Sequence, residues 1–274
     1  FPRYPLGWDQ WLPALLDLVG YDSEDEELIF FVGEADYQEE LEKRDFKTSL
    51  QERQFGISAT MIRENPSLYW KYIAQPFRRH FTKKVLIMGS ASNGKTTLAK
   101  DLARYYDAPV SMEYAREYQI QNNVRDDELT SKDYYYLLLG QYAQTSRLID
   151  SSANRGLVVA DTNSLVTKAY YDYYLKESPV QDEETDTFDN LFVSILSKEK
   201  WDLILFAEPV GTYVNDGFRD MSMADEAIRS DFSSHLKKLK EECLAHIPTV
   251  YLAGSYLDNY QAAKEAINKI YQAD

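Results

Sequence analysis

Short apolar runs alternate with longer, helically periodic segments over most of this chain. Such runs are typical of strands that are buried on both faces of a sheet. They lie at residues 85–88, 109–112, 157–160, 203–207 and 249–252. The segments between them repeat apolar residues every three or four positions, which predicts amphipathic helices. These helices are predicted at residues 96–106, 131–153, 164–176, 186–198, 224–244 and 256–271.

Alternating strands and helices predict an α/β fold with a five-stranded parallel sheet that is covered by helices on both faces. In such a sheet, ligands bind at the carboxyl ends of the strands. Candidate catalytic and binding residues are therefore expected directly after each apolar run.

Residues 1–82 show a less regular pattern, which is too short for a complete α/β domain. A buried strand is predicted at 28–32, a charged helix at 34–44, and short helices at 66–72 and 75–81. We interpret residues 1–82 as a partial Rossmann-like segment that precedes a second domain at 83–274.

The first strand of the second domain runs into Gly-Ser-Ala-Ser-Asn-Gly-Lys-Thr-Thr at residues 89–97. This matches G-x-x-x-x-G-K-[ST], a loop whose backbone N–H groups surround phosphate oxygens. Lys95 is expected to reach the β- and γ-phosphates, and the Thr96 hydroxyl to bind Mg²⁺. The ATP-binding residues predicted on this loop are Gly89, Ser92, Asn93, Gly94, Lys95, Thr96 and Thr97.

Charged residues follow three of the other predicted strands. Glu113 and Arg116 come after the second strand, where they form either one edge of the site or a surface turn. Asp161 ends the third strand, so it is predicted to bind Mg²⁺ with Thr96 or to accept a proton. Arg219 and Arg229 follow the fourth strand and could neutralise the transferred phosphoryl group or form surface salt bridges.

The composition narrows the choice of function. The net charge of −15 excludes a general nucleic-acid or membrane-surface binder, because either would need a basic face. A single cysteine, Cys243, allows no disulfide within the chain and is typical of the reducing cytoplasm. The 22 tyrosines indicate either half-buried helix faces or stacking platforms for a flat ligand.

The ordered motifs resemble those of the NadR family, which joins a nicotinamide-nucleotide adenylyltransferase domain to a ribosylnicotinamide kinase domain. Residues 83–274 resemble the kinase, through the P-loop and the segments 113–117, 161–163, 216–219 and 254–260. Residues 1–82 resemble the second half of the adenylyltransferase, and the family's G-x-F-x-P-x-H-x-G-H motif is missing. The resemblance therefore indicates a chain truncated at its N-terminus, with Ser58, Thr60 and Arg63 as the remnant of a second nucleotide site.

The resemblance implies ATP-dependent phosphorylation of nicotinamide riboside to the mononucleotide in NAD salvage. The predicted catalytic residues are Lys95, Asp161, Glu113 and Arg219. Those predicted to bind the riboside are Glu113, Arg116, Asp161, Asn163, Tyr213 and Asp216. Residues 213–232 are expected to form a lid that excludes water, with Tyr213 stacked on the pyridinium ring. Asn163 and Tyr213 stand where many members have Asp and Trp.

A cytoplasmic protein is expected from the single cysteine, and no membrane insertion is expected because no apolar run approaches the roughly 18 residues of a spanning helix. A homo-oligomer is expected because an exposed sheet edge in residues 1–82 would favour association. NAD is expected as product or effector, with a functional link to a vitamin transporter. The choice between Glu113 and Asp161 as proton acceptor stays open. Two other functions also stay open, namely a P-loop kinase for another nucleoside and a nucleotide-sensing regulatory module. The sequence lacks N-K-x-D, which argues against a GTPase.

Overall fold

The computed structural model describes residues 7–22, 27–175, 183–210 and 213–272. The chain divides into two compact units, Phe1–Met61 and Ile62–Asp274. Residues 62–82 therefore belong to the second unit. There the Trp70 indole Nε1 donates a hydrogen bond to the Asn154 carbonyl oxygen at 2.8 Å. The resemblance instead divides the chain after residue 82, where similarity to one family domain gives way to similarity to the other. That domain boundary stays a prediction.

The first unit is a small α/β assembly. It contains α1 (Trp8–Val19), β1 (Ile29–Val32), α2 (Ala35–Glu42), β2 (Lys47–Leu50) and a short 3₁₀ turn, η2 (Gln54–Gly56). The two strands are parallel, with Ile29 paired to Lys47. Its core is formed by Leu12, Val32 and Leu41. The sequence predicted a buried strand here, but Phe31 of β1 is 73% exposed, and the described residues of this unit form a sheet of only two strands.

The second unit contains a parallel sheet with the strand order β4-β5-β3-β6-β7. The strands are β3 (Lys83–Met88), β4 (Val110–Ser111), β5 (Leu157–Asp161), β6 (Leu203–Ala207) and β7 (Thr249–Leu252). The central strand β3 pairs with β5 on one side and with β6 on the other, in parallel registers that align Ile87 with both Asp161 and Leu205. The loops after β3 and β5 therefore emerge side by side at one edge of the sheet.

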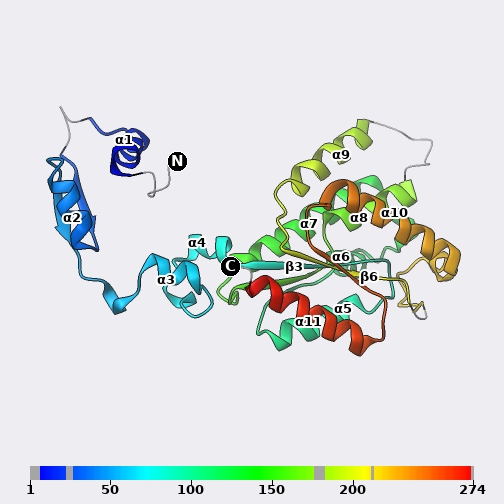
Figure 1. Cartoon of the computed structure of the whole chain (residues 1–274). Coiled ribbons are helices and arrows are strands. Elements are labelled where there is room, and N and C mark those ends of the chain that lie inside the picture. The colour runs from blue at the N-terminus through cyan, green and yellow to red at the C-terminus, as the bar shows by residue number, and fades with distance from the viewer. Residues whose placement is uncertain (1–6, 23–26, 176–182, 211–212, 273–274) are drawn as a thin grey trace. The chain divides into compact units, whose positions relative to one another are not determined.

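Helices cover both faces of this sheet (Figure 1). One face carries α5 (Lys95–Tyr105) and α11 (Tyr256–Gln272), which pack over a core centred on Val85, Ile87 and Leu102. The other face carries a larger core around Leu138, Phe188 and Phe232. Its helices are α6 (Tyr114–Asn122), α7 (Ser131–Ile149), α8 (Ser164–Leu175), α9 (Glu183–Leu196) and α10 (Glu226–Leu244).

Several short helical segments complete the second unit. They are α3 (Ala59–Glu64), η3 (Trp70–Tyr72), α4 (Gln75–Phe81), η4 (Asp126–Glu128) and η5 (Met221–Ala224), with α3 spanning the boundary between the units. Helix α7 begins at a capping box, in which the Thr130 backbone N–H donates to Asp133 Oδ2 at 2.7 Å. Helix α10 begins where the Asp225 carboxylate accepts hydrogen bonds from two backbone N–H groups.

The periodicity predictions for the second domain are confirmed, with all five strands and six helices within a few residues of their expected positions. Helices α1, α3 and α6 and strand β2 were not predicted. Helix α6 has a weak apolar pattern, because its contacts with α7 are made largely by the rings of Tyr114 and Tyr118. For this reason the sequence pattern at α6 predicted a loop at the end of a strand or a surface turn, and not a helix.

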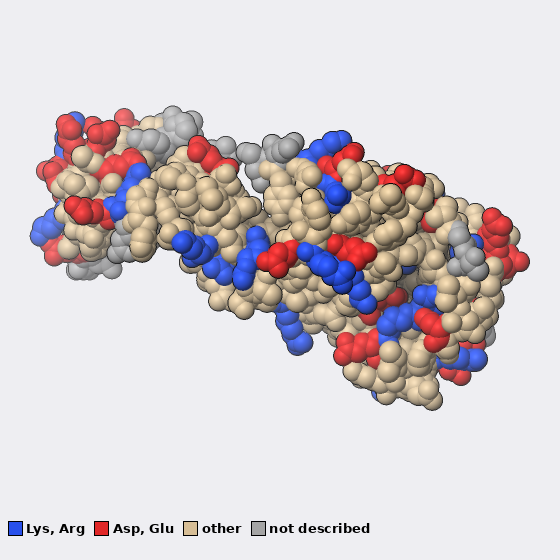
Figure 2. Space-filling model, turned by 90° about the horizontal axis from the view of Figure 1, so that it is seen from below, with Lys and Arg blue, Asp and Glu red and all other residues tan. Residues whose placement is uncertain are grey.

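The surface carries charges of both signs. On the face shown in Figure 2, Lys and Arg atoms are interspersed with Asp and Glu atoms rather than gathered into one broad basic area. Within the part of the chain that the structure describes, no helix combines the length and apolarity required to traverse a lipid bilayer.

Candidate active site

The phosphate-binding loop joins β3 to α5, and two of its glycines have backbone conformations that side chains rarely adopt. Gly89 has φ 141° and Gly94 has φ 72°. A Cβ atom on Gly89 would lie 2.3 Å from the carbonyl oxygen of Ala207, at the end of β6. The loop can therefore run this close to β6 only with glycine at position 89, which explains the first glycine of the motif.

The loop's lysine and threonine are directed toward the end of β5. Lys95 Nζ donates to the Ser90 carbonyl oxygen at 2.7 Å, and Thr96 Oγ1 donates to Asp161 Oδ2 at 2.5 Å. Asp161 is fully buried, and its Oδ1 has no hydrogen-bond partner among the described residues. Burial raises the pKa of Asp161 to about 6, against the lowering effect of the nearby Lys95 ammonium. Burial in turn lowers the pKa of Lys95.

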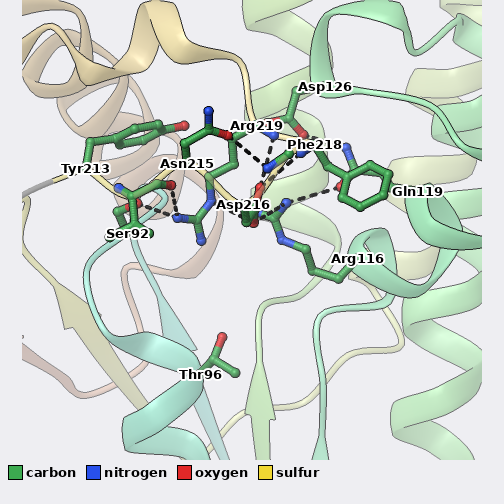
Figure 3. A network of polar contacts seen from close by, with 12 residues as sticks. Ser92, Thr96, Arg116, Gln119, Asp126, Tyr213, Asn215, Asp216, Phe218 and Arg219 are labelled. Carbon is green, nitrogen blue, oxygen red and sulfur yellow. Dashed lines mark hydrogen bonds and ion pairs between the residues drawn. The ribbon is translucent and has the colours of Figure 1, made fainter.

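A network of polar contacts connects the P-loop with the loop after β6 (Figure 3). Arg219 Nη1 donates to Ser92 Oγ at 2.5 Å, and the same hydroxyl accepts the backbone N–H of Val214 at 3.0 Å. The Asp216 carboxylate lies between two arginines, 3.2 Å from Arg219 Nε and 2.9 Å from Arg116 Nη1. Asp216 thereby links the loop after β6 to helix α6.

Asp126, in the segment between α6 and α7, holds this loop from the other side. Its Oδ2 accepts the backbone N–H of Asp220 at 3.2 Å, and its own N–H donates to the Phe218 carbonyl oxygen at 3.0 Å. Its Oδ1 accepts Gln119 Nε2 at 2.7 Å (Figure 3). Burial raises the pKa of Asp126, against the lowering effects of its hydrogen bonds and of the Arg116 guanidinium.

A pocket opens beside this network, with a cavity volume of about 40 Å³. Two carboxylates, Glu113 and Asp126, contribute to its wall together with Arg116. Three tyrosines also line it, Tyr134, Tyr170 and Tyr174. The Tyr134 hydroxyl is buried and has no hydrogen-bond partner among the described residues. The pocket is thus acidic and aromatic, and it presents one unsatisfied polar group.

Comparison with known proteins identifies the family. A family model described as AAA domain matches residues 84–257. The chain is 31% identical over 246 residues to the trifunctional NAD biosynthesis/regulator protein NadR of Escherichia coli, covering 87% of this chain and 56% of that protein. It is 30% identical over 276 residues to the NadR of Salmonella typhimurium, and that match covers 97% of this chain and 63% of that protein. The chain therefore spans about three fifths of the curated relatives' length.

Solved structures give the same result. A crystal structure of NadR protein in complex with NR is 38% identical, with a TM-score of 0.75, and the match covers 97% of this chain and 75% of that one. The chain belongs to the NadR family. A second NadR structure, in complex with NAD and AMP-PNP, is 36% identical, with a TM-score of 0.73 over 99% of this chain and 75% of that one.

The kinase fold itself is shared more widely than the NadR family. A deoxyadenosine kinase structure from M. mycoides matches with a TM-score of 0.54 at 13% identity, covering 68% of this chain and 99% of that one. At this identity the likeness concerns the fold alone.

The structure brings most of the predicted NadR-type site residues together. Thr96 is hydrogen-bonded to Asp161, and the charge of Lys95 interacts with that of Asp161. The network of Figure 3 contains Ser92, Arg116, Asp216 and Arg219. Asn93 lies in the P-loop, where its Nδ2 donates to Ser90 Oγ at 2.8 Å. Thr97 lies in the first turn of α5. Gly211 and Thr212, in the loop before Tyr213, lie outside the described residues.

Three predicted residues have surroundings that the sequence did not indicate. Asn163 donates from Nδ2 to Glu199 Oε2 at 2.9 Å and does not line the pocket. Tyr213 lies under the Arg219 guanidinium, at 5.7 Å from ring centroid to Cζ, and donates its hydroxyl to the Asp220 carbonyl oxygen. Arg229 is buried on α10, and its Nε and Nη1 have no hydrogen-bond partner among the described residues.

The remnant residues lie around one short helix. Ser58 Oγ accepts the Met61 backbone N–H at 3.1 Å, which places Ser58 at the start of α3. Thr60 and Arg63 are both exposed on that helix.

Sequence reasoning did not identify Asp126, Gln119 and the pocket tyrosines. Asp126 follows a charged helix and no apolar strand, so its pattern resembles an ordinary surface turn. Tyr134, Tyr170 and Tyr174 lie within the tyrosine clusters, and stacking of these rings on a flat ligand stays a prediction. Tyr134 and Tyr171 are buried core residues, whereas Tyr170 and Tyr174 are partly buried and line the pocket with Tyr134.

Proposed function

We propose that this chain transfers the γ-phosphoryl group of ATP to the 5′-hydroxyl of nicotinamide riboside. The observation that carries this proposal is the position of the P-loop and buried Asp161 beside a pocket that contains two carboxylates and three tyrosines. The relatives named above support it, because one solved NadR structure is a complex with NR and another a complex with NAD and AMP-PNP.

The phosphates of ATP would bind to the backbone N–H groups of the P-loop and to Lys95. Arg219 reaches the loop at Ser92, so its guanidinium can neutralise charge on the phosphoryl group during transfer. Arg229 supplies a second buried guanidinium with unsatisfied donors, which suits an anion. Fixed donors of this kind stabilise the transition state without having to reorganise.

Thr96 and Asp161 are the residues that would hold Mg²⁺. Their hydroxyl and carboxylate oxygens are ligands that this ion prefers, and Asp161 Oδ1 has no other partner among the described residues. Within the described part of the chain, no cluster of three or more His, Cys, Asp or Glu side chains could hold a metal alone. Bound there together with ATP, the ion would neutralise negative charge on the phosphates during transfer.

The riboside would bind in the acidic pocket. Nicotinamide riboside carries a positive charge on its pyridinium ring, which suits the carboxylates of Glu113 and Asp126 and the faces of Tyr170 and Tyr174. The unsatisfied Tyr134 hydroxyl could bind the carboxamide group. Because the cavity volume is only about 40 Å³, the pocket would have to widen to admit the substrate. The proposed lid at residues 213–232 adjoins the pocket through Asp220, which contacts Asp126 and Tyr174, so its movement would contribute to this widening.

We assign the role of proton acceptor to Glu113. Glu113 lines the pocket and also the neighbouring hollow that contains Thr96, so its carboxylate would lie between the two proposed substrates. Asp161 does not line the pocket, and its Oδ2 is bound to Thr96. This division leaves Asp161 for the metal and Glu113 for the attacking hydroxyl.

The assay that tests the proposal measures ADP release from ATP with nicotinamide riboside, uridine or deoxyadenosine, and without a nucleoside. We expect release that depends on nicotinamide riboside and is reduced at least roughly 10³-fold in Lys95→Ala. Equal rates with all three nucleosides would refute the substrate assignment. ATP binding without any nucleoside-dependent turnover would favour the nucleotide-sensing module instead.

The same proposal includes the cellular setting expected from the sequence. It places the chain in the cytoplasm as a homo-oligomer, with NAD as product or effector and with a functional link to a vitamin transporter. It also assigns Ser58, Thr60 and Arg63 to a nucleotide site of the adenylyltransferase type. Sedimentation of the purified chain tests the oligomer, and calorimetric titration with NAD tests the effector.

A further inference from the structure

A second cavity lies away from the candidate active site, around the start of β3 and the turn before β6. Its volume is about 440 Å³, which is within the size range of small-molecule pockets. Three segments of the second unit enclose it, the end of α4, the last turns of α7 and residues 198–201. The P-loop follows the opposite end of β3, so the cavity belongs to a different part of the unit.

The wall of this cavity is basic, although the chain as a whole carries a net charge of −15. Its cationic or titratable basic residues are Arg79, His80, Lys84, Lys198 and Lys200, and its one carboxylate is Glu199. Among the described residues, Lys198 and Lys200 have no ion-pair partner within 4.0 Å, whereas Arg79 and Lys84 are paired with aspartates. Two unpaired ammonium groups beside a cavity suit an anion of more than one charge.

The carboxylate of Glu199 lines the same cavity, but its hydrogen bonds are made to residues that follow Asp161. Glu199 Oε2 accepts Asn163 Nδ2 at 2.9 Å and the Ser164 hydroxyl at 2.9 Å. Burial raises the pKa of Glu199, against the lowering effect of these hydrogen bonds. The side chain thus joins the cavity wall to the residues that follow Asp161. Among the described residues, Lys198 and Lys200 remain the lysines of the wall without an ion-pair partner.

The remainder of the wall is aromatic and apolar. Trp201 is 9% exposed and contributes to the lining together with Tyr142 and Ile149. The apolar part offers a surface for a flat ring, and the basic part offers charge for a phosphate. Inorganic phosphate alone would leave most of a 440 Å³ cavity unused.

We infer that this cavity, which we call the basic cleft, binds a small organic phosphate with a flat ring, at a site separate from the P-loop. The phosphate is bound by Lys198 and Lys200, with Lys84 and Arg79 at the margin. The ring lies against Trp201 and Tyr142. Since Glu199 connects the basic cleft to Asn163 and Ser164, an occupant lies one hydrogen-bonded side chain away from the segment after Asp161.

Pyridoxal 5′-phosphate provides a probe with this chemistry. It contains a phosphate, a flat ring and an aldehyde that condenses with a lysine amine, releasing water, to an imine that borohydride reduces to a stable amine. The Lys95→Ala chain removes the P-loop lysine from the reaction. We expect labelling of Lys198 or Lys200 to saturate with probe concentration, and labelling of exposed Lys238 to rise linearly. Linear labelling at all three lysines would overturn the inference.

Competition separates recognition of the whole ligand from recognition of phosphate alone. Pyridoxine 5′-phosphate lacks the aldehyde and should protect Lys198 and Lys200 at about tenfold lower concentration than inorganic phosphate does. Equal protection by both would refute the role assigned to the ring. Protection by neither would refute the site.

Matched charge variants test the basic cleft without relying on labelling. In the Lys95→Ala background, Lys198→Gln/Lys200→Gln should weaken calorimetric binding of pyridoxine 5′-phosphate by about tenfold or more. The control Lys132→Gln/Lys238→Gln removes the same charge from positions that are exposed, as Lys198 and Lys200 are, but do not line the basic cleft, and should leave binding unchanged. Equal weakening by both pairs would show that only overall charge matters, and so would overturn the inference. Because all the variants lack Lys95, the outcome does not depend on the proposed kinase activity.

Discussion

Arg219 and Ser92 are joined by a 2.5 Å hydrogen bond, although 127 positions separate them in the sequence. The bond connects the loop after β6 to the middle of the P-loop. Any movement of that loop is therefore transmitted directly to the segment that is expected to surround the phosphates of ATP.

The Arg219–Ser92 contact gives the first prediction. Arg219→Ala should lower kcat for riboside phosphorylation by roughly 10²- to 10³-fold, because a guanidinium directed at the phosphoryl group is lost. Ser92→Gly should raise the KM for ATP several-fold with a much smaller effect on kcat. Glycine suits this comparison because Ser92 has φ 65°, so removing the hydroxyl in this way adds no backbone strain. Steady-state kinetics measure both effects, and equal losses of kcat in the two variants would contradict the roles assigned here.

Gly89→Ala provides a test of the close approach between the P-loop and β6. The new Cβ would lie 2.3 Å from the Ala207 carbonyl oxygen, and the backbone at φ 141° would also be strained. We expect a loss of roughly 2–5 kcal/mol in the free energy of unfolding. Gly217→Ala is the matched control, because Gly217 has φ 89° with no atom within 4 Å of its added Cβ, and should cost only about 1–2 kcal/mol. Urea denaturation of the two variants compares the values, and similar losses would argue against the clash.

Asp126→Asn should distinguish a charged substrate from neutral ones. If Asp126 faces the pyridinium ring, the variant should raise the KM for nicotinamide riboside by about tenfold more than the KM for a neutral nucleoside. Asparagine also weakens the anchor to Asp220, because it offers one acceptor oxygen where Asp126 uses two. That structural effect should be similar for all nucleosides. The ratio of the two KM changes therefore measures the effect of the Asp126 charge on binding of the charged substrate. An unchanged ratio would remove Asp126 from substrate recognition.

The buried Glu199 predicts a pH dependence of stability. Its folded pKa lies above the ordinary value of 4.5, so the folded chain favours the protonated form. Stability from this group is complete below pH 4.5 and is lost as the pH rises through the folded pKa. Glu199→Gln should therefore gain stability relative to the parent chain as the pH is raised from 4.5 to 8.

The control for this prediction has the opposite sign. The pKa of Glu241 is lowered below 4.5, chiefly by its hydrogen bond to Lys240, so its contribution to stability is present above pH 4.5 and is lost as the pH falls through the folded pKa. Glu241→Gln should therefore be less stable than the parent by a nearly constant amount from pH 4.5 to 8, and this difference should shrink below pH 4.5. Urea denaturation at several pH values measures both trends. Parallel trends in the two variants would show that a general charge effect is responsible.

Local patterns in the sequence predicted the elements of the second unit, because each buried strand forms its own apolar run and each helix its own periodicity. The P-loop was equally clear, since its spacing is fixed by backbone contact with phosphate. The sequence could not indicate that Asp126 faces the end of the loop after β6, because that contact depends on how α6 and α7 pack. It also could not indicate that Asn163 is bound by Glu199, which lies 36 positions further along the chain.

The two faces of the sheet support different parts of the candidate site. The P-loop helix α5 lies over one core, whereas the acidic pocket is built by α6, α7 and α8 over the other. A change that loosens the first core should therefore impair the use of ATP, and one that loosens the second should impair the choice of acceptor. In evolutionary terms, such a scaffold can acquire a new acceptor by remodelling one layer of helices while the phosphate-donating layer is inherited unchanged.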